Sequence, residues 1–193
     1  MTFAKVPVDA RHPRANKLDD DTEDFEVREG IRNTLTARRR QVGMFAKTAS
    51  LNAGRPKEWC GYLERPEKTS SFHWRFNDIH QWAEVLGVDL YMVPELNPVL
   101  PEDRIGPLAR TGVTMSSMSA VGTLEYLRDW RVFHGIEQKD LGARLGVGHS
   151  TMWAIEESAN PKISTVQRYC RGLGGRISFH MEKVDIPAFL FPA

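Results

Sequence analysis

The sequence predicts a mainly α-helical fold built from two similar halves, each of which ends in a short β-strand. Apolar residues recur at helical spacing through much of the chain, and the chain aligns with itself at a shift of 92 residues without a gap. Under this shift Gly43 falls on Gly135 and Gly54 falls on Gly146. Each half then has the order helix, helix, turn, helix, helix, strand. We interpret this repeated order as an internal duplication.

The bulk composition is ordinary for a soluble globular protein, with 41% hydrophobic and 26% charged residues in 193. No apolar run approaches the roughly 18 residues that a membrane-spanning helix needs, and the first residues lack the apolar segment of a secretory signal. Cys60 and Cys170 form no CxxC pair, which favours buried thiols in a reducing compartment over a disulfide. We therefore expect a cytoplasmic protein that makes no membrane contact.

The overall charge of +1 conceals an uneven distribution along the chain. Residues 28–75 carry a net charge of +7, and residues 120–176 carry +2. Residues 1–27 carry −3 and residues 76–119 carry −4. A polyanion would be attracted to the first basic region. A basic stripe is often only a solvated face, so charge alone leaves the partner open.

Composition also suggests the domain boundaries. We expect a flexible N-terminus over residues 1–20, a first domain over 21–95, a linker over 96–121, a second domain over 122–184 and a tail over 185–193. The expected linker is rich in proline and has no sustained period. It therefore separates two regions that each have a regular pattern.

Local patterns predict the elements within each domain. In residues 19–41, acidic side chains crowd the start, arginines crowd the end and apolar residues recur every fourth position, which predicts a helix. Residues 70–87 and 164–175 read as the last helix of each domain. Residues 88–94 and 176–182 alternate between apolar and polar side chains, as strands do.

Residues 137–157 predict two short helices joined by a tight bend. Leu141 and Leu145 lie four positions apart, so they share the inward face of the first helix. Gly146 allows the left-handed conformation that ends a helix, and Gly148 lets the next helix begin at a steep angle. This second helix then presents its first residues to solvent.

The outward residues of the second helix are small and polar in the second domain. There we expect Met152 and Ile155 to face the core, and the outward residues are His149, Ser150 and Thr151. In the first domain Pro56 suits the first helical position because its missing N–H is not needed there. The outward residues there are Lys57, Glu58, Gly61 and Tyr62. Trp153 either faces a ligand or is buried against the linker, and the sequence leaves both readings open.

With this pair of helices, the second half resembles the Cro/cI-type (XRE, lambda-repressor-like) helix-turn-helix domain found in phage repressors. The resemblance covers residues 122–183 and is carried by Gln138, Leu141, Ala143, Gly146, Val147, Ser150, Thr151, Ile155 and Glu156. Residues 28–95 resemble the same domain more weakly, because Gly54 and Glu64 match while Ala46 stands where the family has Gln. The resemblance implies two lambda-repressor-like helix-turn-helix domains.

The resemblance implies binding to double-stranded DNA, with the second helix of each pair in the major groove, and therefore association with the nucleoid. The base-reading residues that it implies are Lys57, Glu58, Tyr62, His149, Ser150 and Ala154. The residues that it implies for the DNA backbone are Arg55, Arg65, Lys68, Gln138, Thr151 and Lys162. Backbone contacts set the register on DNA but carry no sequence information.

The resemblance further implies two ion pairs, Arg39 with Glu64 and Arg131 with Glu156, each 25 residues apart. We assign all four side chains to folding rather than to binding. If each pair is partly buried, the loss of one partner costs on the order of 3–5 kcal/mol, because a charge is left without its counterion.

The resemblance therefore implies a transcriptional regulator, and more specifically a repressor, as in phage immunity and lysogeny. The outward residues of the two domains differ, so we expect a monomer that reads an asymmetric operator as an intramolecular pseudo-dimer. We also expect residues 89–93 and 176–181 to pair as an antiparallel sheet that joins the domains.

The alternative function is an antitoxin or another protein-interaction module, in which the acidic N-terminus or the apolar tail docks a protein partner. No glycine-rich phosphate loop, nucleophile elbow or metal-ligand spacing is present in the sequence. We therefore expect no enzyme activity, no metal and no cofactor.

Overall fold

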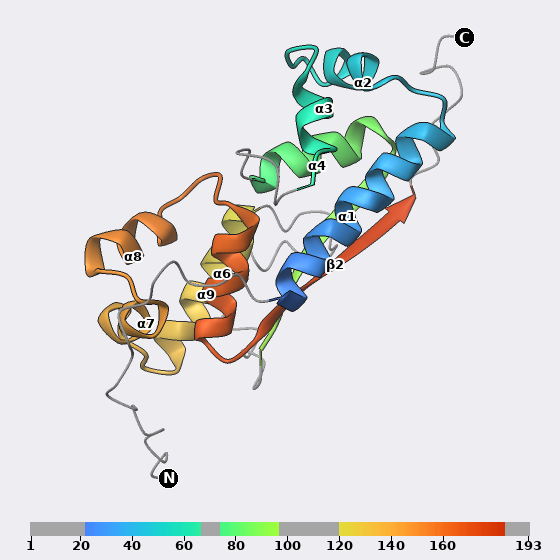
Figure 1. The fold of residues 1–193 in the computed structure, drawn as a ribbon. Coiled ribbons are helices and arrows are strands. Elements are labelled where there is room, and N and C mark those ends of the chain that lie inside the picture. Colours follow the sequence, from blue (N-terminus) through green and yellow to red (C-terminus); the bar gives the residue numbers. More distant parts are fainter. Residues whose placement is uncertain (1–21, 67–73, 97–119, 184–193) are drawn as a thin grey trace.

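The computed structural model describes residues 22–66, 74–96 and 120–183. The first half contains α1 (Thr22–Gln41), α2 (Ala46–Asn52), α3 (Trp59–Leu63), α4 (Phe76–Val85) and β1 (Val88–Glu95). The second half contains α6 (Ala120–Phe133), α7 (Gln138–Leu145), α8 (His149–Glu156), α9 (Ile163–Gly172) and β2 (Arg176–Lys183) (Figure 1). The mainly helical fold and the order of elements in each half are as the sequence predicts.

Several sequence-based expectations lie outside the described residues. These are the flexible N-terminus over residues 1–20, the tail over 185–193, all but the ends of the linker over 96–121, and the backbone contact of Lys68.

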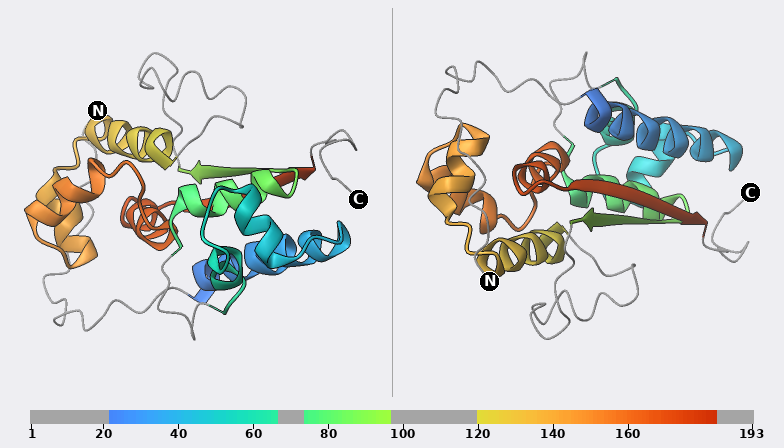
Figure 2. Two further views of the ribbon diagram at one scale, coloured as in Figure 1. Left: turned by 90° about the horizontal axis from the view of Figure 1, so that it is seen from above. Right: turned by 90° about the horizontal axis from the view of Figure 1, so that it is seen from below.

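The two strands pair with each other and join the halves. β1 and β2 run antiparallel, in a register that sets Val88 opposite Lys183 and Met92 opposite Phe179. The predicted pairing of the two segments is thereby confirmed. Both views of Figure 2 show α7 and α8 at one end of the molecule and α1 to α3 at the other, with α9 between them and the sheet running alongside α1.

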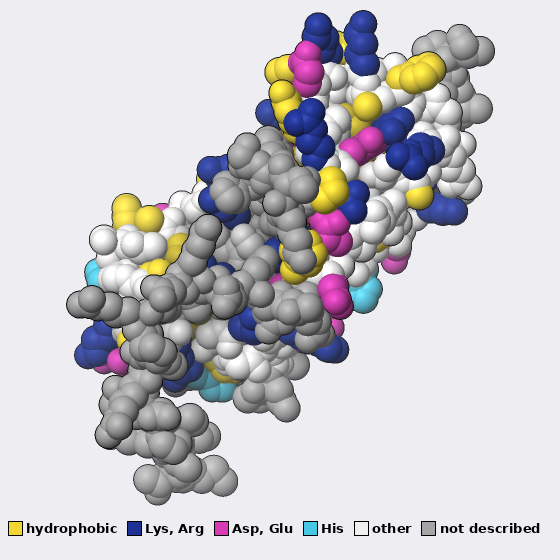
Figure 3. Space-filling view, viewed as in Figure 1, with side chains coloured by type: hydrophobic (Ala, Val, Ile, Leu, Met, Phe, Trp, Pro, Cys, Tyr) yellow, Lys and Arg dark blue, Asp and Glu magenta, His cyan; other side chains and the backbone are white. Residues whose placement is uncertain are grey.

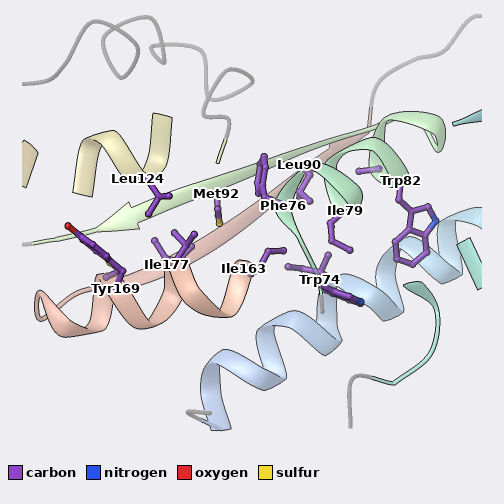
Figure 4. Packing of buried hydrophobic residues seen from close by; sticks show 14 of the residues in the cluster. Trp74, Phe76, Ile79, Trp82, Leu90, Met92, Leu124, Ile163, Tyr169 and Ile177 are labelled. Carbon is purple, nitrogen blue, oxygen red and sulfur yellow. The ribbon is translucent and has the colours of Figure 1, made fainter. Parts of the chain in front are cut away.

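One hydrophobic core runs through both halves. Trp74 and Ile79 from the first half belong to the same buried cluster as Ile163 and Ile177 from the second (Figure 4). Leu96, which the sequence assigns to the linker, is buried in this cluster too. A Cβ atom built on Gly175 would lie 2.4 Å from its side chain, so a glycine there allows the close packing. The two halves are therefore packed together rather than separated at residue 96.

The duplication is visible in the backbone hydrogen bonds. The turn after α1 is closed by Met44 N–H donating to Arg39 O at 3.1 Å, and the turn after α6 by Ile136 N–H donating to Arg131 O at 3.0 Å. The glycines in these turns have positive φ, 67° for Gly43 and 66° in its counterpart. The two turns share only the arginine and the glycine in sequence, yet they have the same backbone hydrogen bond and the same glycine conformation.

The shift of 92 residues does not extend over the whole repeat. α4 begins at Phe76 and α9 at Ile163, which are 87 positions apart. The last glycines with positive φ, Gly87 and Gly174, are also 87 positions apart. Counted from the equivalent residues Glu64 and Glu156, the stretch that leads to the next helix is therefore five residues longer in the first half, and the gapless alignment is wrong beyond that point.

With the corrected shift, equivalent residues of the two halves meet each other. Arg75 forms an isolated antiparallel bridge with Lys162, which lies 87 positions later. Met92 and Phe179, opposite each other in the sheet, are 87 positions apart as well. Two copies of one position meet in this way on the two-fold axis of a homodimer. A pseudo-two-fold axis therefore passes through the bridge and through the centre of the sheet.

Polar contacts between α1 and α9 add to the junction. Arg28, which is 1% exposed, donates from Nη1 to Gln167 Oε1 at 2.7 Å. Gln167 Nε2 donates in turn to Asp24 O at 3.3 Å, and the Asp24 carboxylate is paired with Arg171. These side chains therefore join α1 to α9 by two hydrogen bonds and an ion pair.

Candidate nucleic-acid interface

The bend between α7 and α8 depends on two glycines. Gly146 ends α7 with φ 65° and ψ 29°, the left-handed conformation that the sequence predicts. Gly148 has an ordinary φ of −76° and open space around it, so the expected role of this glycine in the bend is wrong. The second glycine is Gly142, where an added Cβ would lie 2.9 Å from Met152 Cγ and from Val147 O. Its lack of a side chain lets α8 pack closely on α7.

Helix α8 buries one side and leaves the other exposed. Met152 is completely buried and Glu156 is buried beside it. The exposed residues at its N-terminal end and along its outer side are His149, Ser150, Thr151, Trp153 and Ala154. Trp153 is 58% exposed, so it is not covered in the structure. The predicted base-reading residues of the second half therefore form one accessible strip.

A buried network holds α8 in place. Glu156 Oε1 accepts from Arg131 Nε at 3.0 Å and from the Tyr169 hydroxyl at 2.6 Å. Glu156 Oε2 accepts from Gln138 Nε2 at 2.8 Å. Burial, together with the hydrogen bond to this carboxylate, raises the pKa of Tyr169 above its ordinary value. The expected Arg131–Glu156 pair is present, and Gln138 is half-buried and held at the start of α7.

The first half repeats the ion pair in a more open setting. Arg39 Nη2 donates to Glu64 Oε2 at 3.0 Å, and a second guanidinium nitrogen contacts Glu64 Oε1. The same guanidinium donates to Met44 O, as that of Arg131 does to Ile136 O. Both expected ion pairs therefore occupy the same place in the two halves.

Helix α3 begins later than the sequence predicts. It starts at Trp59, so Pro56, Lys57 and Glu58 lie in the preceding turn, which is closed by Trp59 N–H donating to Pro56 O at 2.9 Å. The expectation that Pro56 opens the helix is wrong: the Pro56 carbonyl closes this turn only three residues on, and the first helical hydrogen bond runs from Tyr62 N–H to Glu58 O at 3.0 Å. Lys57 and Glu58 are exposed, and Tyr62 is 42% exposed.

Arg55 has a structural role that the sequence does not predict. It donates from Nε to Gln81 Oε1 at 2.7 Å, and its Nη2 lies 3.3 Å from Asp78 Oδ1. Its guanidinium also lies over the Trp59 ring, 5.6 Å from the centroid. These contacts tie the turn before α3 to α4. The predicted DNA-backbone contact of Arg55 thus competes with contacts inside the protein.

The remaining predicted backbone residues are placed differently. Arg65 is exposed, and its guanidinium lies over the Tyr62 ring at 4.7 Å from the centroid. Thr151 is exposed on α8. Lys162 is half-buried at the bridge with Arg75, on the pseudo-two-fold axis rather than beside α8.

Helices α3 and α8 lie on the same side of the molecule. Figure 1 shows them on either side of the point where α4 and α9 begin, with the sheet on the opposite side. On the face shown in Figure 3, Lys and Arg side chains gather over the end formed by α1, α2 and α3. The exposed cations of these elements and of the turns beside them are Arg40, Lys47, Lys57 and Arg65.

Sequence reasoning missed Arg75, which it placed inside a helix. Arg75 is exposed and precedes α4 as its N-terminal cap position, where Lys162 stands before α9. The signal is present in the sequence, but only when the halves are aligned with a gap after α3. The shift of 92 sets Arg75 opposite Gln167 and hides the match of two cations.

The described residues offer no metal site and no membrane helix. They hold no group of three or more His, Cys, Asp or Glu side chains suited to a metal ion. None of the helices in those ranges is both long enough and apolar enough to cross a bilayer. Comparison with models of known protein families, with characterised proteins and with solved structures gave no match.

Proposed function

We propose that this chain is a sequence-specific double-stranded DNA-binding regulator that carries two unlike lambda-repressor-like helix-turn-helix domains. The observation that carries the proposal is the outer side of α8. Its exposed residues are His149, Ser150, Thr151, Trp153 and Ala154, and they stand on a helix that is held from behind by a buried ion pair. An α-helix fits the major groove of B-DNA, where the edges of the base pairs are distinguishable.

The chemistry of the exposed residues suits this role. His149 and Ser150 supply short hydrogen-bonding groups, and Ala154 leaves room for a thymine methyl group. In the first half, Lys57 donates to guanine and Glu58 accepts from cytosine N4 in the proposed complex. The Lys57 Nζ and Glu58 Oε1 atoms lie 3.6 Å apart in the structure, and both side chains are well exposed, so they separate readily to meet base edges.

The two reading surfaces differ, so the proposed operator is asymmetric. A homodimer with two-fold symmetry reads a palindrome because its two surfaces are identical. Here the two surfaces belong to one chain, and β1 and β2 make within the chain the strand pairing that would otherwise join two copies. The protein is proposed to act as a monomer, and repression is the regulatory outcome that the family resemblance favours.

Binding-site selection from random duplex DNA tests the proposal. The intact chain is expected to enrich one asymmetric site. His149→Ala should relax selection in one half of that site, and Lys57→Ala should relax it in the other. Lys47→Ala serves as a control, because Lys47 is exposed on α2 and is not one of the proposed base-reading residues. The absence of any enriched site at low salt would refute DNA reading.

A protein-interaction module is the second candidate, and exposed apolar side chains favour it. Phe45 is 79% exposed and Leu51 is 57% exposed at α2, while Val132 and Phe133 are exposed at the end of α6. An interface made by such groups changes little with salt, whereas DNA binding through several phosphates weakens steeply. A titration of binding against salt concentration therefore separates the two functions.

A further inference from the structure

Two cations meet on the pseudo-two-fold axis. Arg75 and Lys162 are partners in the isolated bridge, which is held by Phe76 N–H donating to Pro161 O at 3.2 Å and Ile163 N–H donating to Trp74 O at 3.0 Å. These two hydrogen bonds are equivalent under the shift of 87 residues. The bridge lies where α4 and α9 begin, on the side of the molecule that presents α3 and α8 (Figure 1).

The charges at the bridge are not neutralised within the described residues. Arg75 is exposed and donates from Nη1 to the carbonyl oxygen of Asn160 at 2.6 Å, which leaves its charge without a carboxylate. The Lys162 ammonium has no hydrogen-bond or ion-pair partner there. The acid nearest in sequence, Asp78, is already engaged by Arg55. Two like charges so placed repel each other, so their juxtaposition does not help the halves to associate.

We propose that Arg75 and Lys162 bind the phosphate backbone of DNA between the two half-sites, at the centre of the operator. This inference rests on the proposed function. A duplex that reaches both α3 and α8 must pass the point midway between them, which is where the bridge lies. The contact binds the sugar-phosphate backbone, so it adds affinity and fixes the register without reading bases.

The central contact also makes the middle of the operator sensitive to the shape of the duplex. The bridge is fixed to both halves by backbone hydrogen bonds, so the protein does not adapt to a displaced backbone. A central segment that brings its phosphates to the bridge at low deformation cost is therefore preferred, even though none of its bases is touched.

The test measures the salt dependence of binding to the selected operator for the intact chain and for Arg75→Gln and Lys162→Gln. Each substitution is expected to reduce the slope of log K against log salt by about 0.9, the value for one phosphate contact on B-DNA. Arg75→Lys keeps the charge and is expected to keep the slope. Lys183→Gln is the matched control, because Lys183 is exposed on β2, at the opposite side of the molecule.

Hydroxyl-radical footprints of the same complexes locate the contact. We expect the two variants to lose protection at the centre of the operator and to keep protection of both half-sites. An unchanged slope and central footprint in both variants, or an equal loss of slope in Lys183→Gln, would overturn the central contact while leaving the proposed function intact. If the intact chain selects no DNA at all, the proposed function fails and this inference fails with it.

Discussion

A single buried carboxylate, that of Glu156, connects four elements of the second half. It accepts hydrogen bonds from Arg131 on α6, Gln138 on α7 and Tyr169 on α9, while it stands itself at the end of α8. Its side chain is 2% exposed, against 15% for Glu64 in the first half. The orientation of the exposed strip on α8 therefore depends on one residue that is itself buried.

We expect Glu156→Ala to lower the free energy of unfolding by about 3–5 kcal/mol, because the Arg131 charge and the Tyr169 hydroxyl lose their partner. Glu157→Ala is the control, since its side chain is 54% exposed and lies 3.8 Å from Arg128, and it should cost less than about 1 kcal/mol. Urea unfolding followed by circular dichroism measures both. Equal stability of Glu156→Ala and the intact chain would contradict the structural role of the network.

Because the pKa values of the two buried thiols are raised, we expect the free energy of unfolding to fall at alkaline pH. Burial raises the pKa of Cys60 and of Cys170 from 9.0 to about 12. In the unfolded chain the thiols lose their protons near pH 9, while in the folded chain they stay protonated up to about pH 12. The unfolded state therefore binds fewer protons in this window, so the free energy of unfolding falls as the pH rises from 9 toward 12.

The decline is expected to approach about 1.4 kcal/mol per pH unit for each thiol. Urea unfolding at intervals above pH 8 measures it, in the intact chain and in a variant that carries both Cys60→Ala and Cys170→Ala. The double variant should show a shallower decline. An identical decline in both proteins would assign the pH dependence to groups other than the thiols.

The two helix pairs, α2 with α3 and α7 with α8, have the same arrangement but are packed by different residues. In the second half Gly142 allows Met152 to lie against α7. The equivalent positions of the first half are Ser50 and Cys60, where the serine hydroxyl accepts the Cys60 N–H at 2.9 Å. A close apolar packing in the second half and a buried hydrogen bond in the first thus hold the equivalent two helices together.

The bend between α7 and α8 provides a test with two glycines two residues apart. Gly146→Ala is expected to destabilise the protein by about 1–2 kcal/mol, because its φ of 65° is unfavourable for any residue with a Cβ atom. Gly148→Ala should cost little, since its φ is −76° and no atom lies near the added methyl group. Thermal unfolding of the two variants compares them directly, and similar melting temperatures would contradict the assignment of the bend to Gly146.

The sequence predicts the elements well where a local cause is sufficient. Periodicity places the helices, alternation places both strands, and the left-handed turn at Gly146 follows from glycine chemistry. The start of α3 is missed because the Pro56 carbonyl closes a turn with Trp59 N–H, so the regular helix begins only at Trp59. The engagement of Arg55 by Gln81 and Asp78 is a contact between distant parts of the chain, which no local pattern shows.

At the scale of the whole molecule, one core and one sheet make the two halves a single body. The buried cluster includes Leu35 and Trp82 from the first half together with Leu127 and Val166 from the second. The sequence predicts the strand pairing, but it also predicts two separate domains with a linker. It misses the shared core because burial at the junction depends on how the two halves pack against each other. The shift of 87 residues after α3 is likewise seen only in the bridge and the strand register, where the two halves meet.

Because the core is shared, we expect unfolding in a single transition. Met92, on the pseudo-two-fold axis, is completely buried, so Met92→Ala should cost about 2–5 kcal/mol. In each protein, far-ultraviolet circular dichroism and tryptophan fluorescence should give the same urea midpoint as each other. The midpoint of Met92→Ala should be lower than that of the intact chain. Two separate transitions in the intact chain would show that the halves are stable independently.

We propose that two unlike DNA-reading surfaces are held at one fixed separation within one chain. The most direct measurement is the affinity for the selected operator after one or five base pairs are inserted between its half-sites. A fixed separation predicts that either insertion reduces the affinity to that of a single half-site, because both surfaces then fail to engage together. An affinity that is unchanged by either insertion would show that the two surfaces do not engage one operator at a fixed separation.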